Sequence, residues 1–212
     1  AYFVQSIESR FYPEEEMVLR QLVDFTYTLP LLFITEATWI ATHLEKHFNQ
    51  KAILVKNGIR KEFFNNTLTP KSARQKGILR LLVEGPLNVS FKNTELALRL
   101  AHKSHADEVW FVTSTEIGSY PKVDKLFSRV PISEIGSIYA SCDVLLKLST
   151  VEGMFGPPLE IYHCGGTSIS YDVSGYDEYI QHGVNGLVSF KRTDEEIISF
   201  INRLKANPDE LN

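Results

Sequence analysis

The chain has 212 residues, 43% of them hydrophobic, which is enough apolar material for a sizeable buried core. Its formal net charge is −4 and its basic residues are scattered, so it lacks the basic surface typical of proteins that bind nucleic acid. We therefore expect no nucleic-acid partner. No apolar run has the length of a membrane span, and no signal peptide is visible. Cys142 and Cys164 show no metal-ligand spacing, so we expect a protein of the reducing cytoplasm.

The first quarter of the chain alternates between predicted strands and helices. Because residue 1 is Ala rather than Met, and the next residues already resemble a strand, we expect a piece of a longer protein. In chain order, the periodicity predicts a strand over 1–5, a helix over 14–28, a strand over 31–35, a helix over 36–49 and a strand over 52–55. Apolar residues at helical spacing supply much of one face of the first helix, namely Met17, Leu19, Leu22, Val23 and Phe25.

The rest of the chain begins with a polar segment, 62–76, that is predicted to be irregular, and then resumes the alternation. In chain order we predict a strand over 78–84, a helix over 92–104, a strand over 108–113, a variable stretch over 122–129, a helix over 133–141, a strand over 143–149, a helix over 157–164, a strand over 167–172, a helix over 176–182, a strand over 186–190 and a helix over 193–205. This alternation predicts an α/β fold, with right-handed βαβ units around a Rossmann-like parallel sheet.

Two glutamates, Glu152 and Glu160, stand eight positions apart around a turn rich in glycine and proline. The strand predicted before the turn places Glu152 at a carboxyl end of the sheet, where open α/β sheets bind ligands. Pro157 and Pro158 suit the first positions of a helix, so Glu160 is predicted in its early turns. A structural interpretation is also open, because a glutamate near a helix start is favoured by the helix dipole alone.

This segment resembles the E-x7-E signature of family 4 retaining glycosyltransferases, which have the GT-B fold. The resemblance implies that Glu160 binds the ribose hydroxyls of a donor nucleotide. It also implies that Glu152, with a catalytic role, and the backbone of Met154, Phe155 and Gly156 face the sugar and the phosphates. Free N–H groups at the helix start would suit a phosphate.

A second segment resembling the family runs from Val83-Glu-Gly85 to Lys92. A strand that ends in glycine, followed by a lysine at a helix start, is suited to a diphosphate. Many family members carry an arginine directly after this glycine, whereas this chain has Pro86. The resemblance therefore implies Gly85 as a binding residue and Lys92 as the catalytic cation. The structural interpretation of Lys92 is a solvated lysine at a helix end.

A third segment, from Val130 to Asp143, is similar to the family's helix before the E-x7-E strand. In that family the residues before this helix lie against the nucleotide base. The resemblance implies that Arg129 and Val130 bind the base, mostly through their backbone. Alone this signal is also consistent with an ordinary helix start.

The resemblance extends over most of the chain and implies two domains. Residues 1–50 are expected to be a remnant of the N-terminal acceptor-binding domain, and residues 51–212 the C-terminal nucleotide-sugar-binding domain. Tyr-Phe-Val-Gln and Phe-Tyr-Pro, near the start, are similar to bacterial rhamnosyltransferases of cell-surface glycan assembly. An isolated chain with so small a remnant is expected to bind donor without transferring sugar.

The implied activity is retaining transfer of a sugar from a nucleotide-diphosphate sugar to a glycan or lipid-linked acceptor in cell-surface polysaccharide synthesis. In the full-length protein, this activity implies peripheral contact with the cytoplasmic face of the membrane. No cofactor and no metal are expected, because the sequence has no Asp-x-Asp pair and no dinucleotide or Walker motif. Two alternatives remain open: a nucleotide-sugar-binding module without turnover, and a GT-B-fold phosphorylase or epimerase.

Overall fold

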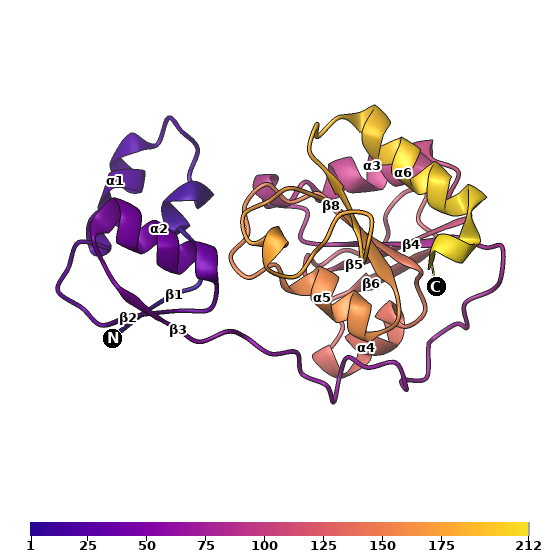
Figure 1. Ribbon diagram of the computed structural model, residues 1–212. Helices are drawn as coiled ribbons and strands as arrows, with labels where there is room; N and C mark the ends of the chain where they lie inside the picture. Colours follow the sequence, from indigo (N-terminus) through magenta and orange to yellow (C-terminus); the bar gives the residue numbers. More distant parts are fainter. Residues whose placement is uncertain (212) are drawn as a thin grey trace. The chain divides into compact units, whose positions relative to one another are not determined.

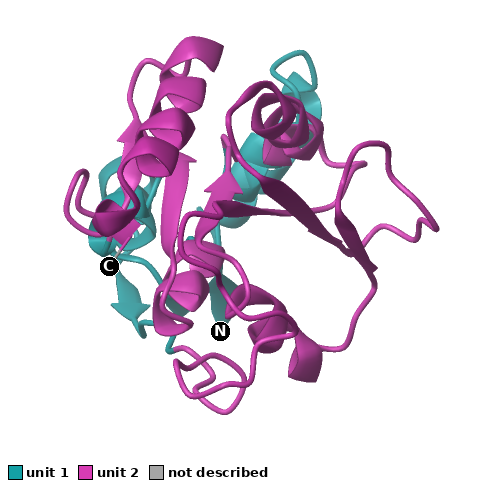
Figure 2. Ribbon diagram, turned by 90° about the vertical axis from the view of Figure 1, so that its right-hand side faces the viewer, with its two compact units in different colours: residues 1–58, 151–155, 173–179 teal, residues 59–150, 156–172, 180–212 magenta. Residues whose placement is uncertain are grey.

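The computed structural model describes residues 1–211, which form two compact units that are coloured separately in Figure 2. Unit 1 consists of residues 1–58, 151–155 and 173–179, and unit 2 contains the other described residues. These units are defined by contacts within the chain, so the domain boundary expected near residue 50 stays a prediction.

Unit 1 is a small parallel α/β body. Its sheet has the order β1-β2-β3, with each strand joined to the next by a helix. Its elements are β1 Tyr2–Val4, the 3₁₀ helix η1 Glu8–Phe11, α1 Met17–Thr26, β2 Phe33–Thr35, α2 Thr38–Phe48, β3 Ala52–Leu54 and the 3₁₀ helix η3 Tyr176–Glu178. The core gathers around Tyr27, Phe33, Ile40 and Leu44, so α2 supplies the helical wall of this core.

Helix α1 forms close to its predicted position, but most of its apolar side chains remain exposed, and only Val23 of the predicted face packs partly against the core. Met17, Leu22 and Phe25 are 59–62% exposed, and no residue of α1 is buried. The apolar spacing therefore predicts the helix but does not predict that its face is covered.

Unit 2 is built on a six-stranded parallel sheet with the order β6-β5-β4-β7-β8-β9. Its elements are β4 Arg80–Glu84, the 3₁₀ helix η2 Ser90–Lys92, α3 Thr94–Lys103, β5 Glu108–Thr113, β6 Lys125–Ser128, α4 Ile132–Tyr139, β7 Val144–Lys147, α5 Gly156–His163, β8 Thr167–Tyr171, β9 Leu187–Ser189, α6 Asp194–Ala206 and the 3₁₀ helix η4 Pro208–Leu211. Helices α3 and α6 cover one face of the sheet and α4 and α5 the other, as Figure 1 shows. The α/β prediction with a Rossmann-like parallel sheet is confirmed.

The strand order of unit 2 reverses direction between β4 and β7. From β4 the chain builds outward through β5 to β6, and then returns to β7 on the other side of β4. Ligands of open α/β sheets bind outside the carboxyl ends of the strands at such a topological switch point. A ligand site is therefore expected at the ends of β4 and β7.

Three local predictions are wrong. The variable stretch 122–129 contains a parallel strand, β6. Residues 176–182, predicted as a helix, form only the 3₁₀ turn Tyr176–Glu178. The helix expected from residue 92 starts at Thr94, because Asn93 is left-handed at φ 50° and separates Lys92 from α3. Among residues 1–211, none of the helices combines the length and apolar character needed to cross a bilayer.

Candidate functional site

The alternation of side chains along β4 and β7 places two charges on the same face of the sheet. Leu82 of β4 and Leu145 of β7 pair across the two strands and pack in the cluster beneath α4 and α5. Since side chains alternate along a strand, Glu84 and Lys147, each two residues further on, point to that same face. Both lie at the carboxyl ends of their strands, at the switch point.

Glu84 and Lys147 form an ion pair at this position. The Lys147 ammonium donates to the Glu84 main-chain oxygen at 3.1 Å and also to the Glu84 carboxylate. The Lys147 side chain is only 3% exposed, whereas that of Glu84 is 25% exposed. A buried lysine is rare unless it is paired, so this contact explains how the cation is tolerated at the end of a hydrophobic strand.

Glu160 approaches the pair from the second turn of α5 and is half-buried. Burial, and next the negative charge of Glu84, raise the pKa of its carboxyl to about 7. Lys147 and a hydrogen bond from the Tyr139 hydroxyl act in the opposite direction. Tyr139 lies at the end of α4 and is fully buried, and burial is also the main reason why its own pKa is raised. A carboxyl in this setting changes its charge near neutral pH.

Gly85 provides the close packing that this end of β4 requires. Its φ is +150°, and a Cβ there would lie 2.5 Å from Thr94 Oγ1 and 3.7 Å from the Lys147 ammonium nitrogen. Thr94 is buried at the start of α3 and donates to the carbonyl oxygen of Pro86 at 2.9 Å. Glycine therefore lets the first turn of α3 approach the ends of β4 and β7.

The remaining predicted residues of unit 2 lie in separate local settings. Lys92 ends η2, where its ammonium lies 5.5 Å from the centre of the Phe91 ring. Arg129 follows β6 with a left-handed φ of 54°, and its exposed guanidinium pairs with Glu116. Val130 packs against the core beneath α4, and Gly156 is the first residue of α5. The structure does not test the roles expected for these residues, which stay predictions.

The first half of the E-x7-E segment belongs to unit 1. The main-chain oxygen of Glu152 accepts a hydrogen bond from Ser6 at 3.3 Å, and the Trp39 indole donates to the Gly153 oxygen at 2.9 Å. A Cβ at Gly153 would lie 1.7 Å from the Gln5 oxygen, so this position needs a glycine. Met154 is half-buried and Phe155 is fully buried. The roles expected for Glu152, Met154 and Phe155 also stay predictions.

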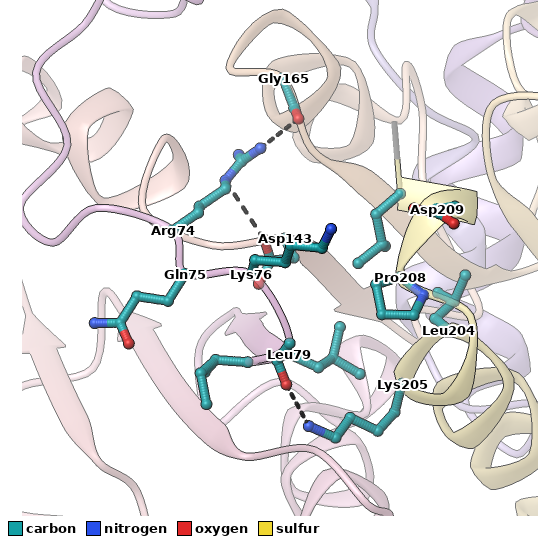
Figure 3. A pocket seen from close by; sticks show the side chains of 13 residues that line it. Arg74, Gln75, Lys76, Leu79, Asp143, Gly165, Leu204, Lys205, Pro208 and Asp209 are labelled. Atoms are coloured by element: carbon teal, nitrogen blue, oxygen red, sulfur yellow. Dashed lines mark hydrogen bonds and ion pairs between the residues drawn. The ribbon is translucent and has the colours of Figure 1, made fainter.

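A cavity of about 350 Å³ lies at the opposite edge of the unit 2 sheet, before the starts of β4 and β7. Figure 3 shows Arg74 extending across it toward Gly165, whose carbonyl accepts a hydrogen bond from the guanidinium. Lys205, on the other wall, donates to the Gly77 oxygen at 2.6 Å and to Asp107 at 2.5 Å. These cations already satisfy local acceptors, so we regard the cavity as structural.

Two charged residues of the site, Glu84 and Lys147, were not singled out from the sequence. The sequence feature that could have identified them is a charged residue at a strand position whose side chain faces the helices that cover the sheet. The lysine stands between Leu146 and Leu148 in a run that otherwise indicates a fully buried strand. Within residues 1–211, no three His, Cys, Asp or Glu side chains are grouped so that they could hold a metal ion.

Known proteins resemble this chain in sequence family and in fold. Residues 121–212 match the model of the family described as Glycosyl transferases group 1. No curated protein matches the sequence.

Several solved structures share the fold of this chain. The chain is similar to HepE of Anabaena in complex with UDP and glucose, at 15% identity and a TM-score of 0.73, with 99% of this chain and 63% of HepE covered. It is similar to sucrose-phosphate synthase from Thermosynechococcus elongatus, at 14% identity and a TM-score of 0.75, with 99% and 59% covered. It is also similar to WaaG, a glycosyltransferase involved in lipopolysaccharide biosynthesis, at 14% identity and a TM-score of 0.79, with 99% and 66% covered. The predicted GT-B fold is confirmed, and the chain spans less than two thirds of the length of HepE.

Proposed function

We propose that the protein transfers a sugar from a nucleotide-diphosphate sugar to an acceptor, with retention of configuration, and the match of residues 121–212 to the model of the group 1 glycosyl transferases supports this proposal. The observation that carries the proposal is the cluster of Glu84, Lys147 and Glu160 at the switch point of unit 2. Doubly wound sheets bind nucleotides at this position, and a carboxylate there is suited to accept hydrogen bonds from ribose hydroxyls. We assign that role to Glu160.

The diphosphate is proposed to lie at the start of α5, with Lys92 as its cation. The first N–H groups of a helix have no partners within the helix, and with the helix dipole they favour a phosphate. In this proposal Gly156 supplies backbone donors, and Gly85 keeps side-chain atoms out of the approach. Arg129 and Val130 are proposed to contact the base through their backbone.

The sugar is proposed to face Glu152 and the backbone of Met154 and Phe155. As the bond between the anomeric carbon and the diphosphate oxygen breaks, Lys92 and the α5 N-terminus stabilise the charge that develops on the leaving group. The acceptor hydroxyl attacks on the same face, and the departing phosphate takes its proton. None of these roles requires a metal ion.

A glycan or lipid-linked acceptor in cell-surface polysaccharide synthesis is the proposed acceptor class. WaaG, which shares the fold, is involved in lipopolysaccharide biosynthesis. HepE has been solved in complex with UDP and glucose, which supports a nucleoside diphosphate sugar as the first ligand class to test. The rhamnosyltransferase resemblance adds dTDP-sugars to that class.

The experiment is a thermal-shift panel of UDP-, GDP- and dTDP-sugars, run on the whole chain with and without EDTA. We expect at least one nucleotide sugar to stabilise the protein, because a ligand that binds only the folded state raises its stability. The Glu160→Gln variant is expected to lose that stabilisation. The control is Glu195→Gln, which changes an exposed glutamate on α6. Equal stabilisation of both variants would remove Glu160 from the site.

A further inference from the structure

Direct contact with a ligand does not explain why the Glu84–Lys147 ion pair lies near Glu160. Lys147 is 3% exposed, which leaves its ammonium little surface with which to meet a ligand. Two of its three N–H groups are directed at Glu84, one at the main-chain oxygen and one at the carboxylate. Burying an ammonium costs several kcal/mol unless partners compensate it, so a lysine at this position calls for a reason.

The reason lies in the two carboxyl groups that meet at this edge. Glu84 ends β4 and Glu160 projects from α5, and the negative charge of Glu84 raises the pKa of Glu160. Two like charges in a partly buried site favour keeping one of them protonated. Lys147, which is paired with Glu84, lowers the pKa of Glu160 and so offsets part of this effect, although the pKa stays raised at about 7.

The other groups that face Glu160 are few. From α4, the Tyr139 hydroxyl donates to its carboxyl, and the Cys164 thiol follows the last turn of α5. Strand β8 also packs on α5, but its tyrosine, Tyr171, lies in the core cluster on the opposite face of the sheet. Among charged side chains, Glu84 and Lys147 have the main effects on the pKa of Glu160, and these effects have opposite signs.

We propose that Glu84 and the buried Lys147 are a positioning pair for Glu160. Glu84 fixes the lysine at the end of β7, and the lysine offsets part of the repulsion between the two carboxylates, so that Glu160 can ionise near neutral pH. This inference rests on the proposed function, and it identifies the two residues that control the charge of Glu160 in the same site. It also makes nucleotide binding dependent on pH near neutrality, because protonation of Glu160 removes an acceptor for the ribose hydroxyls.

The test follows the Glu160 carboxyl directly, by ¹³C NMR of the whole chain over a pH titration, with Glu160→Gln used to assign the resonance. This readout needs no ligand, so it can fail or succeed independently of the proposed function. In Lys147→Met the titration midpoint is expected to rise by about one pH unit or more, because the balancing cation is gone. In Glu84→Gln it is expected to fall, because the repelling charge is gone. Lys147→Arg, which keeps the cation, should leave the midpoint close to that of the unmodified protein.

The same variants are then titrated with the nucleotide sugar that stabilises the protein. A rise of about one pH unit lowers the ionised fraction at neutral pH about fivefold, so Lys147→Met should bind about fivefold more weakly there and recover at higher pH. A midpoint unchanged in both Lys147→Met and Glu84→Gln would overturn the proposal. So would an affinity loss of the same size at every pH, which is the behaviour of a direct ligand contact or of general damage. If Lys147→Met does not fold, the direction of the shift in Glu84→Gln decides alone.

Discussion

The Glu160→Gln substitution separates a binding role from a structural one, because the two roles predict opposite effects. For binding, the amide loses charge-assisted hydrogen bonds to the ribose, which contribute about 1.5–3 kcal/mol. Nucleotide affinity should therefore fall by roughly 10- to 150-fold. Isothermal titration calorimetry at a pH above the titration of Glu160 measures this loss with the carboxylate fully ionised in the parent protein.

The same substitution should raise the free energy of unfolding above neutral pH, although it lowers nucleotide affinity. Burial and Glu84 raise the pKa of Glu160 from 4.5 to about 7, so the folded chain binds this proton more tightly than the unfolded chain does. Its contribution to stability is complete below the unfolded value and is lost as the pH rises through about 7. At about 1.4 kcal/mol per pH unit, the upper value of the loss is about 3 kcal/mol, or about 2 kcal/mol after allowance for partial exposure.

Glutamine does not ionise, so it avoids this loss. Between about pH 5 and about pH 8 the free energy of unfolding of Glu160→Gln should therefore rise by about 2 kcal/mol relative to that of the parent protein. Urea unfolding across that range measures the gain, and Glu195→Gln, at an exposed site, should show none. A stability difference that does not change with pH would refute the raised pKa. An unchanged nucleotide affinity would refute the assigned role of Glu160, whatever the stability shows.

Three further predictions follow from the same geometry. Gly85→Ala should cost about 1–3 kcal/mol in urea unfolding, because it strains a positive φ and brings a Cβ against Thr94; unchanged stability would contradict the packing at the end of β4. Glu178→Ala should cost about 1 kcal/mol, because the Glu178 carboxylate accepts from the Thr38 and Trp39 N–H groups at the start of α2, and Glu45→Ala on the exposed face of α2 should cost less. Nucleotide-sugar binding should persist in EDTA; loss in EDTA with recovery on adding Mn²⁺ would overturn the metal-independent mechanism.

Much of the fold could be predicted from the sequence because the buried strands of unit 2 are continuous apolar runs. The missed strand, β6, is an edge strand of four residues, and edge strands are often short and charged. The helix expected over 176–182 fails because Glu178 is engaged with the start of α2 and Tyr179 leaves the helical conformation, with φ −155°. Tertiary contacts of this kind are not visible in local periodicity.

The site could be predicted only where its residues lie close together in sequence. The spacing of Glu152 and Glu160 predicts a site at α5, and Gly85 and Lys92 predict one at the end of β4. Lys147 could not be assigned, because its partner Glu84 is 63 positions away and the two meet only through the register of β4 and β7. A charged residue inside an apolar strand indicates a buried partner, but the sequence does not identify that partner.

The most direct test of the central claim uses the 12 glycines of the chain, several of which mark the two edges of the unit 2 sheet. Gly85 and Gly156 lie at the carboxyl edge by β4 and α5, whereas Gly77 and Gly165 line the cavity at the opposite edge. A protein labelled with ¹⁵N-glycine, titrated with the stabilising nucleotide sugar, gives a simple NMR spectrum of these positions. We predict that the Gly85 and Gly156 resonances shift with ligand concentration while those of Gly77 and Gly165 do not. Shifts confined to Gly77 and Gly165 would contradict a nucleotide site at the switch point.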